Sequence, residues 1–184
     1  HMGVSEEFFH PAANTIKDYD FIYTGNLSDE RKLPALLKVF DDGPLKQHSI
    51  LMLGNDVDRL SRDYRHCKNI IFKEPVPWPE VPAHLNAARY AVNYIPDEEP
   101  FNAQTSTKFL EYAAMKIPIV STNYFWISEF QERWGGNYFL LKQDLSNLTW
   151  DRISGFDFEF PKLESWRWEE KIRSSGIVEF LRQI

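Results

Sequence analysis

The segment "TSTKFLEYAAMKIPIVST" (residues 105–122) decides the fold, because it puts the start of a helix directly ahead of a buried strand. Hydroxyl side chains open the segment, an amphipathic stretch follows, and a short run of branched apolar residues closes it. Hydroxyl residues are preferred N-caps of helices, and short branched apolar runs are typical of strands buried on both faces. The segment therefore predicts one helix-to-strand step of a parallel sheet.

The same alternation of apolar runs and amphipathic stretches extends over most of the chain and predicts an α/β fold. We expect a Rossmann-like open parallel sheet of about six strands flanked by helices. A closed barrel of eight such units usually needs about 250 residues, so the length of 184 residues favours a single open sheet. The expected strands are 20–24, 49–53, 69–72, 91–94, 118–121 and 137–140, and the expected helices are 33–40, 57–64, 81–88, 106–114 and 127–133.

The two ends of the chain differ from this central region. Residues 1–2 are interpreted as a cloning remnant, and residues 3–19 have the loop character of an interdomain linker or an ordered arm. The Rossmann-like domain is expected to span residues 20–162. Residues 163–184 contain two tryptophans and a charged helical face, which predicts a crossover-type helix packing across the domain or a neighbouring surface.

Charge and cysteine content limit the function classes. The net charge of −6 without a basic run argues against binding to DNA or RNA. The single cysteine, Cys67, cannot form an internal disulfide, and the chain has no long apolar span. A cytoplasmic location is expected, at the inner face of the membrane if a part of the protein outside this chain attaches there.

The hydroxyl cluster suggests an anion site. Thr105, Ser106 and Thr107 combine free backbone N–H groups with the positive end of the helix dipole. Lys108 is unfavourable in a first helical turn unless an anion binds there, and Glu111 lies on the same helical face, where its carboxylate can bind a diol. The alternative is that Ser106 is only an N-cap and that Lys108 and Glu111 form a solvated pair.

A second loop with cations follows the first expected strand. In "YTGNLSDERK" (residues 23–32), Gly25 permits a tight turn, and Arg31 and Lys32 precede the next helix. Both loops belong to the carboxyl edge of the sheet, so their cations are expected to converge on a diphosphate. The alternative treats Gly25 as a plain turn residue and the cations as ordinary surface residues.

Five segments together resemble the C-terminal, donor-binding domain of a GT-B glycosyltransferase of family 4, the glycosyl transferases group 1. "GVSEEFFHP" is similar to the interdomain junction, "YTGNLSDERKLPALLKVF" to the first phosphate loop, and "NIIFKEPVPWPEVPAHLNAARYAVNYIP" to the base-binding region. "TSTKFLEYAAMKIPIVST" resembles the Lys-x-x-Glu segment, and "SWRWEEKI" resembles the terminal helix that crosses back to the N-terminal domain.

The resemblance implies roles for individual residues. Lys32 matches a lysine that binds the pyrophosphate in the family, with Arg31 as its alternate. Lys108 matches a lysine that contacts the nucleotide phosphates, and Glu111 matches the glutamate that binds the ribose. Lys32, Lys108 and Glu111 are the implied catalytic residues. The implied donor-binding residues are Gly25, Asn26, Arg31, Lys32, Glu74, Pro75, Val76, Phe101, Asn102, Ser106, Thr107, Lys108 and Glu111, with 74–76 at the base and the 97–102 loop at the sugar.

The chain also departs from the family pattern. Ala103 stands at the first glutamate of the Glu-x7-Glu motif, and whether Glu98 or Glu99 replaces that glutamate is open. Asn26 replaces a common arginine and Lys116 a common glycine. These differences leave the donor sugar undetermined.

The implied function is retaining transfer of a sugar from a nucleoside-diphosphate sugar, with UDP favoured, to a hydroxyl acceptor in polysaccharide or glycoconjugate synthesis. No cofactor or metal is expected, because Asp56 and Asp58 are interpreted as helix-cap residues and the histidines are scattered. Catalysis would need an N-terminal GT-B domain outside this chain, so this domain alone is expected to be inactive.

Two other function classes remain open at this point. One is half of a GT-B-type sugar-nucleotide epimerase, and the other is a non-catalytic α/β binding module. A dinucleotide-binding Rossmann domain is disfavoured, because no G-x-G-x-x-G sequence follows the first expected strand.

Overall fold

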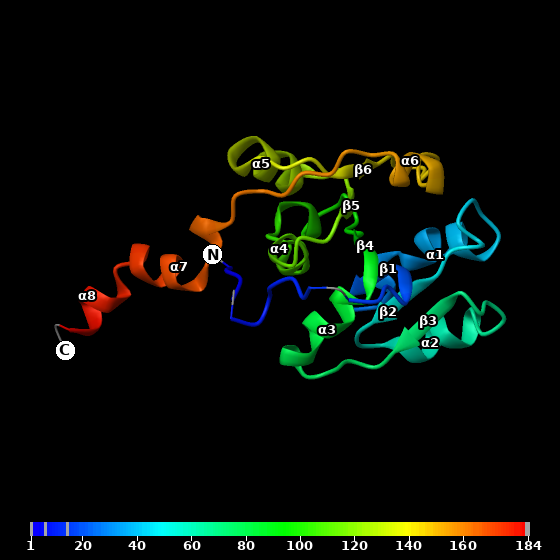
Figure 1. Ribbon diagram of the computed structural model, residues 1–184, viewed down its shortest axis with the longest axis horizontal. Coiled ribbons are helices and arrows are strands. Elements are labelled where there is room, and N and C mark those ends of the chain that lie inside the picture. The colour runs from blue at the N-terminus through cyan, green and yellow to red at the C-terminus, as the bar shows by residue number, and fades with distance from the viewer. Residues whose placement is uncertain (1, 6, 14, 183–184) are drawn as a thin grey trace.

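A six-stranded parallel sheet forms the centre of the molecule, in the order β3-β2-β1-β4-β5-β6 (Figure 1). The structure is a computed structural model that describes residues 2–5, 7–13 and 15–182. Each neighbouring pair of strands is parallel, which confirms the predicted open sheet. The strands are β1 (Tyr19–Thr24), β2 (Ile50–Leu53), β3 (Ile70–Lys73), β4 (Ala88–Asn93), β5 (Ile119–Thr122) and β6 (Phe139–Leu141).

Helices connect successive strands, and the predicted ones are present with shifts of one or two residues at most ends. A further short helix before the C-terminal tail was not predicted, because its few residues give no helical period to recognise. The helices are α1 (Leu33–Asp41), α2 (Val57–Asp63), α3 (Val81–Asn86), α4 (Thr107–Ala114), α5 (Phe125–Trp134) and the unpredicted α6 (Trp150–Ser154).

The sheet is buried on both faces. Alternate residues of β1 enter different clusters, with Ile22 on one face and Phe21 and Tyr23 on the other, as the two-residue period of a strand requires. α3, α4 and α5 contribute to the cluster of Ile22, and α1, α2 and α6 to that of Phe21. Helices on both faces leave the carboxyl ends of the strands at one open edge, where loops can form a site.

The described residues before β1 (2–5, 7–13 and 15–18) include an N-terminal arm that packs on the domain, while the linker interpretation stays a prediction. Val4 and Phe9 are buried in the same cluster as Ile22. The Val4 amide donates to the Trp166 carbonyl at 2.9 Å, and the Trp168 amide donates to the Val4 carbonyl at 3.2 Å. The arm therefore joins the start of the domain to the segment that leads into the C-terminal tail.

The C-terminal tail differs from the single packing helix that was predicted. It forms two short helices, α7 (Trp168–Ser174) and α8 (Ile177–Leu181), separated by Gly176 at φ 73°. Neither helix contains a buried residue, and both extend away from the sheet (Figure 1). Trp166 at the start of the predicted segment packs in the core cluster, whereas α7 and α8 do not, so packing of the tail against a neighbouring surface stays a prediction.

None of the helices in the described part of the chain combines the length and the apolar character needed to span a bilayer.

Candidate functional site

A cavity of about 340 Å³ lies at the carboxyl edge of β1, β2 and β3, where open α/β sheets bind ligands. Its volume falls within the range of small-molecule sites. Its walls come from the loops after these strands, from the start of α3 and from the first two turns of α4. The lining residues are Thr24, Gly25, Asn26, Arg31, Leu53, Gly54, Asn55, Pro75, Val76, Val81, Thr107, Lys108 and Glu111.

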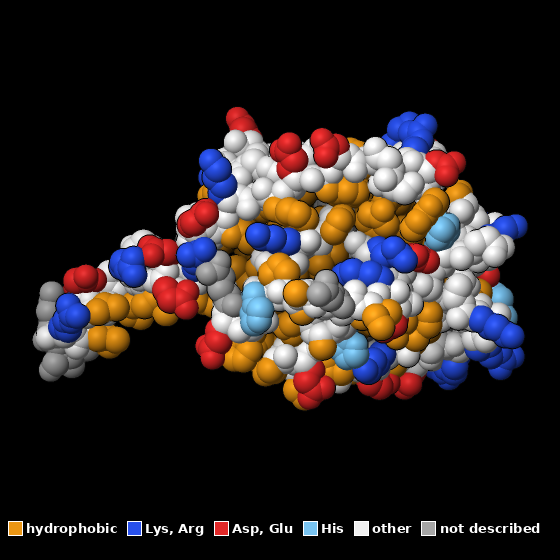
Figure 2. Space-filling model, viewed as in Figure 1, with side chains coloured by type: hydrophobic (Ala, Val, Ile, Leu, Met, Phe, Trp, Pro, Cys, Tyr) orange, Lys and Arg blue, Asp and Glu red, His pale blue; other side chains and the backbone are white. Residues whose placement is uncertain are grey.

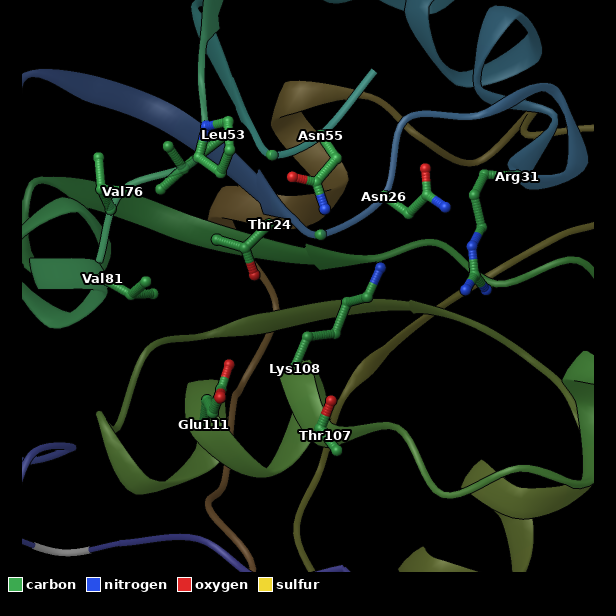
Figure 3. Close-up of a pocket in the computed structure, with 13 residues that line it drawn as sticks. Thr24, Asn26, Arg31, Leu53, Asn55, Val76, Val81, Thr107, Lys108 and Glu111 are labelled. Atoms are coloured by element: carbon green, nitrogen blue, oxygen red, sulfur yellow. The ribbon is translucent and has the colours of Figure 1, made fainter. Parts of the chain in front are cut away.

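The cavity is chemically different at its two ends (Figure 3). Val76 and Val81 lie at one end, near Glu111, while Asn26 and Arg31 lie at the other. The Lys108 side chain extends between them toward the loop that follows β1. From one end of the cavity to the other, the site thus presents an apolar wall, the Glu111 carboxylate, and the Lys108 and Arg31 cations.

Lys108 is enclosed between an aromatic ring and the Gly25 loop, with Arg31 as a neighbouring cation. Its ammonium nitrogen lies 3.9 Å from the centroid of the Tyr23 ring, and a methyl group on Gly25 would approach that nitrogen to 3.5 Å. Burial and the neighbouring Arg31 charge lower the pKa of Lys108 to about 7, against the opposing effect of Glu111. A bound anion would supply the missing counter-charge, since attraction between opposite charges favours the ammonium form.

Glu111 is held by Trp78, whose ring packs on the N-terminal arm. Trp78 Nε1 donates a hydrogen bond to Glu111 Oε1 at 3.2 Å, and the Trp78 ring contacts Phe8 and Phe9 with centroid distances of 4.9 and 5.1 Å. Burial raises the pKa of Glu111, while the bond from Trp78 and the charge of Lys108 oppose the rise. Lys108 and Glu111 both line the cavity, with Lys108 over the Tyr23 ring and Glu111 bonded to Trp78, and their role in binding stays a prediction.

The floor of the cavity depends on two glycines that touch each other. Gly25 has a φ of 123°, which L side chains rarely adopt. A Cβ on Gly54 would lie 1.6 Å from the Gly25 carbonyl oxygen, so only glycine fits there. Sequence reasoning identified Gly25 and missed Gly54, although Gly54 directly follows the end of β2.

Lys32 is not beside Lys108 in this cavity. It has a left-handed conformation at φ 52°, and its ammonium pairs with the Glu98 carboxylate in a second cavity of about 590 Å³. Arg31 lines the first cavity, with its guanidinium carbon 4.6 Å from the centroid of the Phe101 ring. The expected pairing of Lys32 with Lys108 is therefore wrong, and Arg31, its alternate, takes that place.

Ser106 also differs from its expected role. Its hydroxyl donates to Asn93 Oδ1 at 2.7 Å and accepts from the Phe109 amide at 3.3 Å, so it acts as the N-cap of α4 and is not available to a phosphate. The neighbouring Thr107 does line the cavity. The interpretation of Ser106 as an N-cap is confirmed.

The remaining expected donor residues divide between the cavity and its surroundings. Pro75 and Val76 line the cavity, whereas Glu74, Phe101 and Asn102 do not. Phe101 instead provides the ring beneath Arg31.

The expected caps of α2 behave differently from the prediction. Asp56 occupies the N-cap position of α2 at φ 62°, but its side chain makes no capping hydrogen bond there. Asp58 is the second residue of α2 and the acidic residue of its first turn.

Comparison with known proteins identifies the fold. No family model matches the chain, and no curated protein matches it by sequence. Solved structures do match, among them AviGT4, a glycosyltransferase of avilamycin A biosynthesis, with 14% identity over 98% of this chain and 55% of that chain and a TM-score of 0.68. The C-terminal domain of LpcC, a glycosyl transferase group 1 family protein from Francisella tularensis, matches with 20% identity over 65% of this chain and 70% of that domain, with a TM-score of 0.51.

A third match has a different activity. The UDP-GlcNAc 2-epimerase of Methanocaldococcus jannaschii, solved with UDP-GlcNAc and UDP, has 14% identity over 91% of this chain and 47% of that chain, with a TM-score of 0.58. The chain thus spans about half the length of AviGT4 and of this epimerase. These likenesses show the fold, which matches the C-terminal domains of GT-B glycosyltransferases, as the sequence motifs predicted.

Proposed function

We propose that this chain is the nucleotide-sugar-binding domain of a retaining GT-B glycosyltransferase. The observation that carries the proposal is one cavity in which Lys108, Arg31 and Glu111 lie along a single hollow beneath the Gly25 loop (Figure 3). A nucleoside-diphosphate sugar has a matching order of groups, with a flat base, a diol and a doubly charged diphosphate. The UDP-GlcNAc bound in the epimerase structure supports a ligand of this class.

The cavity suggests how the donor would lie. The base would contact Val76 and Val81 at the apolar end, and the ribose diol would donate to the Glu111 carboxylate. The diphosphate would then reach Lys108 and Arg31, beside Thr107 in the first turn of α4. The backbone N–H groups of this helix terminus and its dipole favour a bound phosphate.

The same cations would assist transfer. When the bond between the anomeric carbon and the diphosphate oxygen breaks, negative charge grows on the diphosphate, and the Lys108 and Arg31 charges stabilise it. The anomeric carbon forms its new bond to the acceptor oxygen, whose proton passes to the departing diphosphate, and the nucleoside diphosphate is released. We propose that an N-terminal GT-B domain outside this chain supplies the acceptor site, so turnover requires both domains.

Calorimetric titration of the chain with UDP-, GDP- and ADP-sugars tests this function. We expect saturable heat with at least one of them and the tightest binding with the UDP-sugar. Flat titrations with all three at millimolar concentration would contradict the proposal.

A second candidate is a sugar-nucleotide epimerase, which the match to the UDP-GlcNAc 2-epimerase favours. It would use the same donor cavity with no acceptor. Incubation of the full-length protein with UDP-GlcNAc alone separates the two functions, because an epimerase would produce an epimerised sugar without an acceptor and a transferase would not.

Glu111 gives a prediction about ribose recognition. Replacing it by glutamine in the variant Glu111→Gln keeps the size of the side chain but removes the negative acceptor, so we expect affinity for UDP to fall about 10-fold, since hydrogen bonds to charged groups are worth about 1.5–3 kcal/mol. The measurement is calorimetry with UDP and with 2′-deoxy-UDP.

The deoxy ligand provides the control for this variant. If Glu111 accepts from the ribose hydroxyls, the parent chain prefers UDP over the deoxy ligand and Glu111→Gln binds the two nearly equally. An unchanged preference in the variant would show that the carboxylate does not contact the ribose.

Lys108 gives a prediction about pH. Because its pKa in the free site is lowered to about 7 and an anion stabilises the ammonium, the bound state has the higher pKa and takes up a proton. Affinity for UDP-glucose is therefore greatest below about pH 7 and falls with rising pH by up to about tenfold per unit. Calorimetry between about pH 6 and pH 8.5 measures this trend, because the sugar nucleotide's own phosphates do not titrate there. A constant affinity would show that Lys108 does not contact the diphosphate.

A further inference from the structure

Three potential metal ligands of different chemistry meet at the end of the sheet opposite the donor cavity. Asp41 is the last residue of α1, and His66 and Cys67 lie in the turn between α2 and β3. This turn feeds the amino end of β3, whereas the donor cavity lies beyond the carboxyl ends of the strands. The cluster is therefore separate from the proposed nucleotide site.

The ligand atoms of these residues converge on one point. His66 Nε2 lies 3.0 Å from Asp41 Oδ1, and Cys67 Sγ lies 2.9 Å from the same oxygen. All three ligand atoms lie within 4.8 Å of one another. In a tetrahedral zinc site with bonds of about 2.0–2.3 Å, neighbouring ligand atoms are roughly 3.3–3.7 Å apart, so small side-chain shifts would open room for the ion.

We propose that Asp41, His66 and Cys67 bind one Zn²⁺ ion, with water in the fourth position. A set of one sulfur, one nitrogen and one carboxylate oxygen suits Zn²⁺ and not the oxygen-preferring Ca²⁺ or Mg²⁺. No metal was expected from the sequence, because the histidines are scattered along the chain. The cluster forms only when α1 and the α2–β3 turn come together. Among the described residues, Asp41, His66 and Cys67 are the one cluster of three or more His, Cys, Asp or Glu side chains whose ligand atoms lie close enough to share an ion.

The surroundings favour a cation. Asp42 directly follows Asp41 after the end of α1, and Asp63 ends α2 just before the turn that carries His66 and Cys67, so two further carboxylates belong to the segments that form the cluster. The site is also accessible, because His66 is exposed and the other two ligands are partly so. An ion can therefore enter without opening the core.

Binding has a defined proton balance. In the free chain the Cys67 sulfur donates a hydrogen bond to Asp41 Oδ1 at 2.9 Å, so the cysteine is described as a thiol. The ion is bound by the thiolate, and one proton is released for each Zn²⁺ taken up. The bound ion joins the end of α1 to the α2–β3 turn and should raise the melting temperature, because it binds the folded chain.

Co²⁺ titration of the chelator-treated chain tests the site. We expect a near-ultraviolet thiolate-to-cobalt charge-transfer band that saturates at one equivalent, disappears on addition of Zn²⁺ and is accompanied by release of one proton. Cys67→Ser should lose the band, and His66→Ala should weaken binding at least tenfold. His84→Ala is the matched control, since His84 lies on α3 beside Lys73, and it should bind like the parent chain.

The outcomes decide between a metal site and a hydrogen-bonded cluster. Absence of the band, or equal binding by Cys67→Ser, His66→Ala and the parent, would overturn the proposal. Circular dichroism of each variant confirms that it folds. UDP-sugar binding is measured on the same samples, and it should be unaffected by Cys67→Ser, so this proposal and the proposed function fail independently.

Discussion

Replacing Lys108 with methionine is expected to lower affinity for a UDP-sugar roughly 30-fold, because hydrogen bonds to charged groups are worth about 1.5–3 kcal/mol and each 1.36 kcal/mol is tenfold. Methionine keeps much of the length of the side chain and can still pack on the Tyr23 ring, 3.9 Å from the present ammonium. The same change removes a charge that burial disfavours. We therefore expect the melting temperature of Lys108→Met to be unchanged or higher while binding falls.

The opposite directions of these two effects make the test specific. A residue that only holds the fold together would lose stability and binding together. Lys46→Met is the control, because Lys46 is an exposed lysine in the turn before β2, at the other end of the strands, and it should leave both quantities unchanged. If Lys108→Met binds the UDP-sugar like the parent chain, the diphosphate does not lie at this lysine, and the non-catalytic binding module becomes the better interpretation.

The sheet was predictable because its signal is local. Each strand is a short apolar run, and burial on both faces makes that run continuous, as in β2, where every residue is buried. β4 begins at Ala88 and not at the predicted residue 91. The prediction missed this start because Arg89 and Tyr90 interrupt the apolar run, although Ala88 and Tyr90 pair with Tyr19 and Phe21 of β1. Strand ends of this kind depend on pairing partners, which a single segment does not reveal.

The donor cavity was partly predictable for the same reason. Gly25, Arg31, Lys108 and Glu111 follow strand ends or begin a helix, so their positions along the chain already assign them to one edge of the sheet. Trp78 could not be assigned in this way, because its contact with Glu111 joins residues 33 positions apart and depends on support from the N-terminal arm.

Which of Arg31 and Lys32 enters the donor cavity depends on the φ angle of Lys32. Adjacent side chains at the end of a helical turn point in different directions, and the left-handed conformation of Lys32 directs it toward Glu98 in the second cavity. Sequence reasoning treated the two cations as alternates and could not select between them without that angle.

The apolar pattern of the C-terminal tail, α7 and α8, does not indicate which surface covers it. Trp168, Ile172 and Phe180 are 38, 48 and 62% exposed, and apolar side chains cover one side of the extended tail (Figure 2). The pattern correctly predicted an amphipathic helical segment, yet the surface that would cover it is not among the described residues.

Replacing Gly54 with alanine is expected to lower the free energy of unfolding by about 2–3 kcal/mol, since inserting a group into a tightly packed site typically costs about 1–3 kcal/mol. The new Cβ would lie 1.6 Å from the Gly25 carbonyl oxygen and 2.8 Å from Leu27 Cδ1. The backbone oxygen cannot rotate away as a side chain would, so the Gly25 loop has to move. That loop faces Lys108, and UDP-sugar affinity should fall more than tenfold along with stability. Denaturant unfolding and calorimetry measure the two effects.

Gly155→Ala is the matched control for the added methyl group. Gly155 follows α6 with a φ of −92°, which alanine adopts, and its nearest neighbour would lie 3.3 Å away. We expect its stability to change by less than about 1 kcal/mol and its nucleotide affinity to stay the same. Losses of similar size in both variants would mean that any alanine in a connecting loop is harmful. A Gly54→Ala chain with parental stability and affinity would mean that the Gly25 loop adapts freely, and the cavity could then not owe its shape to the contact of these two glycines.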